Sequence, residues 1–167
     1  VLVATDDRRI YDHVAAFGGE AVMTSPLHRS GTDRCAEATG KLETVPDAII
    51  NIQGDEPFID PLQIDLLAGA FSDAGTGIAT LATPITAADD LFNENVPKVV
   101  ISRNGEALYF SRAAIPHCRG AAKNEWPAKH PYYRHIGLYA YRTDILRALT
   151  VLPPSLHEQP EALEQLR

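Results

Sequence analysis

The sequence is poor in cysteine, in blocks of basic residues and in long apolar runs, and each shortage narrows the classes of protein to which it can belong. Its 167 residues include two cysteines, Cys35 and Cys118, in neither a zinc nor a redox spacing, which indicates reduced thiols in a cytoplasmic protein. A net charge of −7 argues against nonspecific binding to nucleic acid or to an anionic membrane. No apolar run approaches membrane-spanning length, so we expect no membrane segment.

Strands and helices alternate in the pattern that the chain does contain. Hydrophobic residues at 45% and charged residues at 22% are ordinary for a globular protein. Apolar spacing predicts helices over residues 7–17, 32–40 and 61–71, between the early strands. This alternation predicts an α/β fold with a mostly parallel, Rossmann-like sheet and helices on both faces. The predicted strands are residues 1–5, 20–24, 48–53, 77–83, 98–102, 107–110 and 135–141.

The second half of the chain differs in character from the first. Asn104 and Gly105, between two apolar runs, predict an antiparallel hairpin insertion. Residues 117–134 lack a clear periodicity, which indicates a functional or mobile loop. The chain opens inside a predicted strand, VLVATDD, and closes inside a predicted helix, EALEQLR. We therefore expect residues 1–167 to form a single domain that is incomplete at both ends.

Two carboxylates follow an apolar run in the stretch IINIQGDEPFID, residues 49–60. Charges at the end of a buried strand are costly to desolvate unless something, often a metal ion, compensates them. Asp55 follows a glycine at the predicted strand tip, and Mg²⁺ prefers one or two carboxylates together with phosphate oxygens and water. The stretch predicts a Mg²⁺ ligand at Asp55, with Glu56 as a neighbour that helps to orient it. The alternative is a turn whose acids face solvent.

The segment TSPLHRSGTDR, residues 24–34, is a loop that leads into a predicted helix. Ser30, Gly31 and Thr32 supply small residues and backbone N–H groups at the start of that helix, which suits recognition of a polar or anionic group. Arg29 and Arg34 add positive charge. The alternative is a helix N-cap with the arginines on a solvated face.

Two further positions carry candidate ligand-binding side chains. Arg112 follows the apolar strand ALYFS, and its guanidinium suits a carboxylate or phosphate, although a surface arginine is the alternative. The segment RHIGLYAYR places His135 and Tyr139 on one face of a predicted strand. A structural role for His135 is the alternative to a role in binding.

Six segments, taken in order, closely resemble CMP-Kdo synthetase, the 3-deoxy-D-manno-octulosonate (Kdo) cytidylyltransferase of lipopolysaccharide synthesis. They are VATDD, GGEAVMTSPLHRSGTDR, NIQGDEPFI, KVVISRNGEALYFSRAAIP, YRHIGLYAYR and LPPS with EALEQLR. The resemblance implies a nucleotidyltransferase sheet and a cytoplasmic, Mg²⁺-dependent homodimer. It also implies transfer of CMP from CTP to Kdo, with pyrophosphate released by attack of the sugar's 2-hydroxyl on the α-phosphorus.

The resemblance also assigns roles to residues of this chain. Asp55 matches the family's metal-binding aspartate and Gln53 matches a residue that contacts the sugar, and these two are the catalytic positions that the resemblance implies. Arg112 matches the arginine that meets the Kdo carboxylate. The nucleotide-binding positions are Ser30, Gly31, Thr32 and Arg34, and the remaining sugar-binding positions are His135, Tyr139, Glu164 and Gln165.

The chain also departs from the family's pattern, and other functions remain open. Nothing in it matches the family's phosphate-cradling loop or its second metal-binding aspartate. A related acylneuraminate cytidylyltransferase is one alternative, and a GT-A-like glycosyltransferase fits less well because it requires a D-x-D motif. An inactive fragment that acts only as a binding or dimerisation core is another. Residues 117–134 are expected to form a lid near the sugar.

Overall fold

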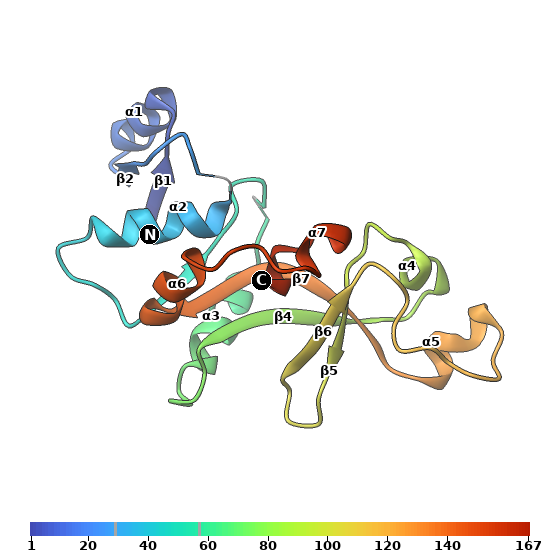
Figure 1. Ribbon diagram of the computed structural model, residues 1–167. Coiled ribbons are helices and arrows are strands. Elements are labelled where there is room, and N and C mark those ends of the chain that lie inside the picture. Colours follow the sequence, from blue (N-terminus) through green and yellow to red (C-terminus); the bar gives the residue numbers. More distant parts are fainter. Residues whose placement is uncertain (29, 57) are drawn as a thin grey trace. The chain divides into compact units, whose positions relative to one another are not determined.

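The computed structural model describes residues 1–28, 30–56 and 58–167, which form two compact units (Figure 1). Unit 1 comprises Val1–Ala79 and Leu138–Val151, and unit 2 comprises Thr80–Gly137 and Leu152–Arg167. This division is finer than the single domain expected from the length, which stays a prediction.

Unit 1 begins with a strand, a helix and a second strand. The strands β1 (Leu2–Thr5) and β2 (Glu20–Met23) pair in parallel, and α1 (Arg8–Ala16) connects them. The carboxylate of Asp7 caps the helix by accepting a backbone N–H at 2.8 Å. The helix is followed by Gly18 at φ +81°, a conformation that glycine adopts without steric cost. The predicted strand–helix–strand alternation is confirmed here.

The next elements of unit 1 are α2 (Gly31–Gly40), β3 (Ala48–Asn51) and α3 (Pro61–Ala70). Helix α3 begins as predicted, because the Asp60 carboxylate accepts a backbone N–H at 3.0 Å and proline occupies the first helical position. Helix α2 follows β2 and helix α3 follows β3. The two connecting loops, which carry most of the candidate residues of unit 1, therefore lie at the ends of these strands.

The rest of unit 1 comes from late in the chain. Strand β7 (Tyr132–Arg142) pairs antiparallel with β3, with Ala48 opposite Arg142 and Asn51 opposite Tyr139. Helix α6 (Thr143–Thr150) continues from β7 and contacts α2. The pairing therefore fixes the end of β3 against a strand that begins about eighty residues later.

Unit 2 is built on a β-hairpin. Strands β5 (Lys98–Ile101) and β6 (Ala107–Ser111) pair antiparallel, and β5 also pairs with the first half of β7. Gly105 has φ +85° in the turn, so the predicted Asn-Gly hairpin is confirmed. The last turns of the chain are α7 (Glu158–Glu161) and η2 (Glu164–Leu166).

The stretch of residues 117–134 is more ordered than its sequence indicates. It contains η1 (Lys123–Glu125) and α5 (Trp126–Lys129), and the Trp126 ring stacks on Tyr132 with centroids 6.1 Å apart. Trp126 is buried in a core with Ile85 and Leu91. Helix α4 (Ala88–Phe92) supplies Leu91, and strand β4 (Ile78–Ile85) supplies Ile85. The stretch packs as part of unit 2, and its expected role as a lid stays a prediction.

The predicted α/β class is confirmed, but the predicted mostly parallel sheet is not what the structure has, because antiparallel pairing is the more common. Strands β1 and β2 form a parallel pair, whereas β3/β7, β5/β6 and β5/β7 are antiparallel, and β4 also pairs with β7. A strand's partner is chosen by packing far along the chain, which local hydrophobic patterns do not encode. Within the described part of the chain, no helix has both the length and the apolar character required to cross a bilayer.

Replacing Leu146 with alanine should lower the free energy of unfolding by about 2–5 kcal/mol, because this α6 side chain is fully buried and leaves a cavity. Leu62→Ala is the matched control, since Leu62 is 66% exposed and should change stability by less than about 0.5 kcal/mol. Urea unfolding of both variants measures the difference. Equal effects would contradict the assignment of Leu146 to the core.

Candidate functional site

Arg34 joins the ends of the first two strands in unit 1. Its Nη1 donates to Thr24 Oγ1 at 2.6 Å, just after β2, and lies 3.2 Å from Asp6 Oδ1, just after β1. An ion pair with this exposure is worth at most about 1 kcal/mol, so it orients more than it stabilises. The segment of residues 24–34 therefore meets the residue that follows β1, and the charge of Arg34 is already shared with Asp6.

Gly31 and Gln53 lie against each other in the same unit. A Cβ atom on Gly31 would lie 2.6 Å from Gln53 Nε2, too close for any larger residue unless Gln53 moved. Gln53 Nε2 also donates to Asn51 Oδ1 at 3.3 Å, at the end of β3. The structure thus brings the segment of residues 24–34 and the QGDEP stretch together at two predicted site residues.

The residues at the N-terminus of α2 differ in what their groups already contact. Ser30 is its N-cap, with Oγ accepting the Asp33 N–H at 3.1 Å, so the capping alternative is confirmed for this side chain. The Thr32 side chain is 5% exposed. Because the first N–H groups of a helix have no acceptor within it, those of Gly31 and Thr32 remain the donors suited to an anion. Arg29, expected to add charge here, lies outside the described residues.

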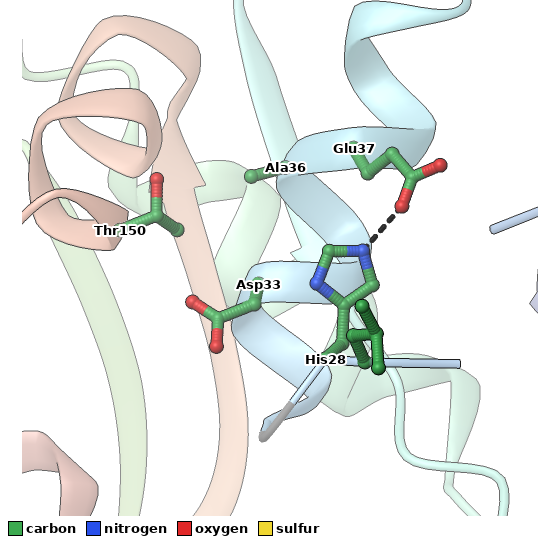
Figure 2. Close-up of a pocket in the computed structure, with 6 residues that line it drawn as sticks. His28, Asp33, Ala36, Glu37 and Thr150 are labelled. Atoms are coloured by element: carbon green, nitrogen blue, oxygen red, sulfur yellow. Dashed lines mark hydrogen bonds and ion pairs between the residues drawn. The ribbon is translucent and has the colours of Figure 1, made fainter. Parts of the chain in front are cut away.

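A pocket of about 440 Å³ opens beside this loop, lined in part by His28, Asp33, Glu37 and Thr150 (Figure 2). The Glu37 carboxylate pairs with His28 Nε2 and accepts the Ser25 N–H at 2.9 Å. Its other oxygen lies 2.6 Å from Lys41 Nζ. The hydrogen bond from Lys41, followed by those from Ser25 and His28, lowers the pKa of Glu37 to about 2. Glu37 therefore stays ionised and ties the base of the loop to α2.

Asp55 and Glu56 are exposed at the turn after β3, as the solvent-facing alternative also requires. No described residue donates a hydrogen bond to Asp55 or forms an ion pair with it. Among the described residues, no group of three or more His, Cys, Asp or Glu side chains gathers to hold a metal. A single free carboxylate still fits Mg²⁺, which usually takes one or two carboxylates and completes its shell with phosphate and water.

Arg112 in unit 2 is held by main-chain carbonyls. Its Nε donates to Glu161 O at 2.6 Å, Nη1 to Glu94 O at 3.0 Å and Nη2 to Ala162 O at 3.3 Å. The side chain is half-buried. The guanidinium has further N–H groups in the same plane, so its predicted contact with a carboxylate requires that they face the ligand. That contact stays a prediction.

His135 lies at the centre of a hydrogen-bonded chain in unit 2. Gln165 Nε2 lies 3.5 Å from His135 Nδ1, and Thr80 Oγ1 lies 2.9 Å from His135 Nε2. Thr80 Oγ1 donates in turn to Ile136 O at 3.1 Å. Because an amide nitrogen can only donate, Nδ1 accepts and Nε2–H donates to Thr80, which fixes the tautomer of a neutral ring.

The environment of His135 keeps its ring neutral. The side chain is 9% exposed, and the Phe110 ring packs edge-on against it at 5.0 Å. Burial lowers the pKa of His135 to about 4. Both ring nitrogens of the neutral imidazole have partners within the chain, as the structural alternative requires, and the predicted contact of His135 with the sugar stays a prediction.

The other predicted sugar residues divide between the units. Glu164 follows the hydrophobic anchor Leu163 in unit 2, and its Oε1 is buried with no hydrogen bond from any described residue. Tyr139 lies in unit 1, where its ring stacks on Tyr141 with centroids 5.8 Å apart. The structure therefore brings His135 and Gln165 together, and it places Tyr139 beside the end of β3.

Two buried or paired side chains of unit 2, Glu161 and Lys98, were not among the candidate residues predicted from the sequence. Glu161 accepts from Ser111 and Arg112, yet a glutamate in the polar run HEQPEALEQLR gives no local signal. Lys98 is fully buried and donates to Asn93 O at 2.9 Å, and its place at the start of the apolar run KVVI was a signal available in the sequence.

Comparison with known proteins gives a consistent set of relatives. The Cytidylyltransferase family model matches residues 1–167. The chain is 56% identical over 171 residues to the 3-deoxy-manno-octulosonate cytidylyltransferase of Parabacteroides distasonis, covering all of this chain and 68% of the relative. It is 55% identical over 168 residues to the protein of the same name from Bacteroides thetaiotaomicron, covering 99% of this chain and 67% of the relative.

One solved structure is similar over nearly the whole chain. It is CMP:2-keto-3-deoxy-manno-octonic acid synthetase complexed with CTP, with a TM-score of 0.90 and 45% identity over 99% of this chain and 66% of that one. The resemblance stated from the sequence motifs is confirmed. The chain spans about two thirds of the length of the relatives it matches.

The buried His135 should make the protein lose stability on acidification. The unfolded ring binds a proton near pH 6.5 and the folded ring only near 4, so its contribution is complete above pH 6.5 and is lost as pH falls towards 4. The loss amounts to about 3 kcal/mol.

Urea unfolding between pH 7.5 and 4 measures this loss for the wild type and for His135→Gln, which should lack it. His130→Gln, at an exposed histidine of the same unit, should behave as the wild type does, and a parallel pH curve for His135→Gln would refute the assignment.

Proposed function

This chain belongs to the cytidylyltransferase family, and we propose that the protein transfers CMP from CTP to Kdo, giving CMP-Kdo and pyrophosphate. The observation that carries the proposal is its identity of 55–56% with proteins named 3-deoxy-manno-octulosonate cytidylyltransferase over essentially the whole chain. A similar structure in complex with CTP supports CTP as the donor. Relatives named for Kdo favour this acceptor over a sialic acid.

The nucleotide is proposed to bind at the N-terminus of α2. The N–H groups of Gly31 and Thr32 and the partial positive charge of the helix end favour a polar or anionic group. Ser30 shapes this terminus as its cap, and Arg34 fixes the strand ends beside it through Asp6. Gln53, packed against Gly31, connects this loop to the turn that carries Asp55.

Asp55 is the residue proposed to hold Mg²⁺. Its carboxylate is exposed and has no described partner, so it needs no rearrangement before binding a cation. Bound Mg²⁺ would neutralise phosphate charge and polarise the α-phosphoryl group. Gln53, two residues before Asp55, contacts Asn51 and Gly31, and these contacts orient the start of the turn.

The sugar is proposed to contact residues of unit 2, and the predicted contacts of Tyr139 and Gln53, which lie in unit 1, stay predictions. The remaining N–H groups of Arg112 suit the carboxylate of Kdo. The amide of Gln165, held beside His135, and the Oε1 of Glu164, which accepts no hydrogen bond from any described residue, suit its hydroxyl groups. Polar groups placed in this way discriminate strongly against acceptors that lack the matching hydroxyls.

In the proposed reaction the 2-hydroxyl oxygen of Kdo forms a bond to the α-phosphorus of CTP, and the bond from that phosphorus to the bridging oxygen breaks. Pyrophosphate carries away the electron pair of the broken bond, and the hydroxyl proton passes to water. The residues of this chain bind and orient the two substrates, which is the main contribution required for such a displacement. A homodimer, a cytoplasmic setting and a role in lipopolysaccharide synthesis complete the proposal.

Pyrophosphate release from CTP and Mg²⁺ tests the proposed function in the full-length protein. Release is expected with Kdo and not with N-acetylneuraminate, because the sugar contacts are proposed to match Kdo. Release with N-acetylneuraminate alone would show that the acceptor is a sialic acid and not Kdo. Release with neither sugar would refute the proposal.

Asp55→Ala should reduce turnover by a factor on the order of 100 or more, because the carboxylate proposed to hold the metal is removed. The fold should be unaffected, since Asp55 is exposed and unpaired among the described residues. Asp65→Ala, at an exposed aspartate of α3 to which no role is assigned, is the matched control and should retain most of the activity. Steady-state rates over a Mg²⁺ titration measure both variants, and near-normal turnover of Asp55→Ala would remove Asp55 from the metal role.

A further inference from the structure

The last turns of the chain are fastened to strand β6 by one carboxylate. Ser111 Oγ donates to Glu161 Oε1 at 2.6 Å, and the Arg112 N–H donates to Glu161 Oε2 at 2.8 Å. The donors lie about fifty residues earlier in the chain, at the end of β6 and just beyond it. Both oxygens of Glu161 therefore bind the strand, which defines the position of the segment in two directions.

The side chain of Arg112 adds hydrogen bonds that run the other way, from the strand side to the backbone of the last turns. We call the contacts of Glu161 and Ala162 with Ser111 and Arg112 the clamp. The Arg112 guanidinium donates to the carbonyl oxygens of Glu161 and Ala162, immediately behind the bound carboxylate. Ala162 has φ +48°, a left-handed conformation that is unfavourable for a residue with a Cβ atom. The clamp holds the chain in this turn, after which it runs into η2.

The surroundings of Glu161 keep it ionised. Burial raises the pKa of its carboxyl group, but the hydrogen bonds from Arg112 and Ser111 and the charges of Arg112 and Lys98 outweigh burial, so that its pKa is lowered. Burial lowers the pKa of Lys98, and the charge of Glu161 opposes that effect. Lys98 is fully buried, and a buried positive charge is costly unless a negative charge compensates it. The charge of Glu161 contributes to this compensation.

The clamp determines where the next residues lie. Leu163 packs in a buried cluster with Val99 and Phe110, and this packing forms a second anchor. Two residues after Leu163, Gln165 reaches the ring of His135. Between these residues Glu164 keeps an oxygen buried without a hydrogen bond from any described residue. A shift of the segment by a fraction of an ångström would break the contact between Gln165 and His135, which is already 3.5 Å long.

We propose that Glu161 is a positioning residue for sugar binding: through Ser111 and Arg112 it fixes the segment that presents Glu164 and Gln165 to Kdo beside His135. Glu161 itself contacts neither the sugar nor the reacting atoms. The inference rests on the proposed function, since it assigns Glu161 to the sugar-binding part of that site.

Glu161→Gln tests the clamp with the least change of shape. The amide oxygen can still accept the Arg112 N–H, but the amide NH₂ then has to donate to Ser111 Oγ, which reverses that hydrogen bond, and the charge is lost. KM for Kdo should rise about tenfold, the size expected for one charge-assisted hydrogen bond, while KM for CTP stays within about twofold. Glu106→Gln, at an exposed glutamate of the hairpin, is the matched control and should change neither constant.

A second readout does not depend on turnover. The ring-nitrogen chemical shifts of His135, measured by NMR without substrate, report whether Gln165 still donates to Nδ1. They should move in Glu161→Gln and stay unchanged in Glu106→Gln. Ser111→Ala keeps the charge and removes one of the two hydrogen bonds to Glu161, together with the one that Ser111 Oγ accepts from the Ala113 N–H, so it should give a smaller rise in KM for Kdo if Glu161→Gln fails to fold.

The outcomes separate the clamp from the proposed function. An unchanged KM for Kdo in Glu161→Gln and Ser111→Ala, or equal rises in KM for both substrates, would overturn the positioning role. A wild type that gives no product with Kdo would refute the proposed function instead. In that case unmoved His135 shifts in Glu161→Gln would still overturn the clamp, and moved shifts would support it.

Discussion

Strand β7 is the constraint on which both units depend, because its backbone supplies hydrogen-bonding partners to each of them. Its last four residues pair with β3 in unit 1, and its first half pairs with β5 in unit 2. The strand also carries His135 in unit 2 and Tyr139 in unit 1, so candidate sugar residues are fixed by ladder hydrogen bonds rather than by loops. Sites supported by strands hold their side chains more rigidly than sites on free loops.

The two units carry different kinds of chemistry. Unit 1 offers a helix N-terminus, the packed pair Gly31 and Gln53, and the exposed carboxylate of Asp55, which suit phosphates and a hard cation. Unit 2 offers neutral hydrogen-bonding groups around a buried histidine, together with a guanidinium held by carbonyl oxygens, which suit a hydroxyl-rich acid sugar. The division agrees with a reaction that joins an anionic nucleotide to such a sugar.

Local signals in the sequence predicted the strands and the main early helices, because periodicity, caps and the Asn-Gly turn act over a few residues. They did not predict that β3 pairs antiparallel with β7, since the paired residues lie about ninety positions apart in the chain. The same reason hid Glu161, whose partners Ser111 and Arg112 are about fifty residues away. Motif resemblance named candidate residues, but only the structure showed that Arg112 is occupied by carbonyls and that Thr32 is buried.

The central claim is that an oxygen of Kdo attacks the α-phosphorus of CTP, and the fate of that oxygen tests it most directly. Kdo carrying an isotopically heavy oxygen in its 2-hydroxyl group should give CMP-Kdo that retains the label between sugar and phosphorus, with none in pyrophosphate. Mass spectrometry of both products after a short incubation measures this distribution. Label in pyrophosphate, or CMP-Kdo formed without the label, would contradict the account.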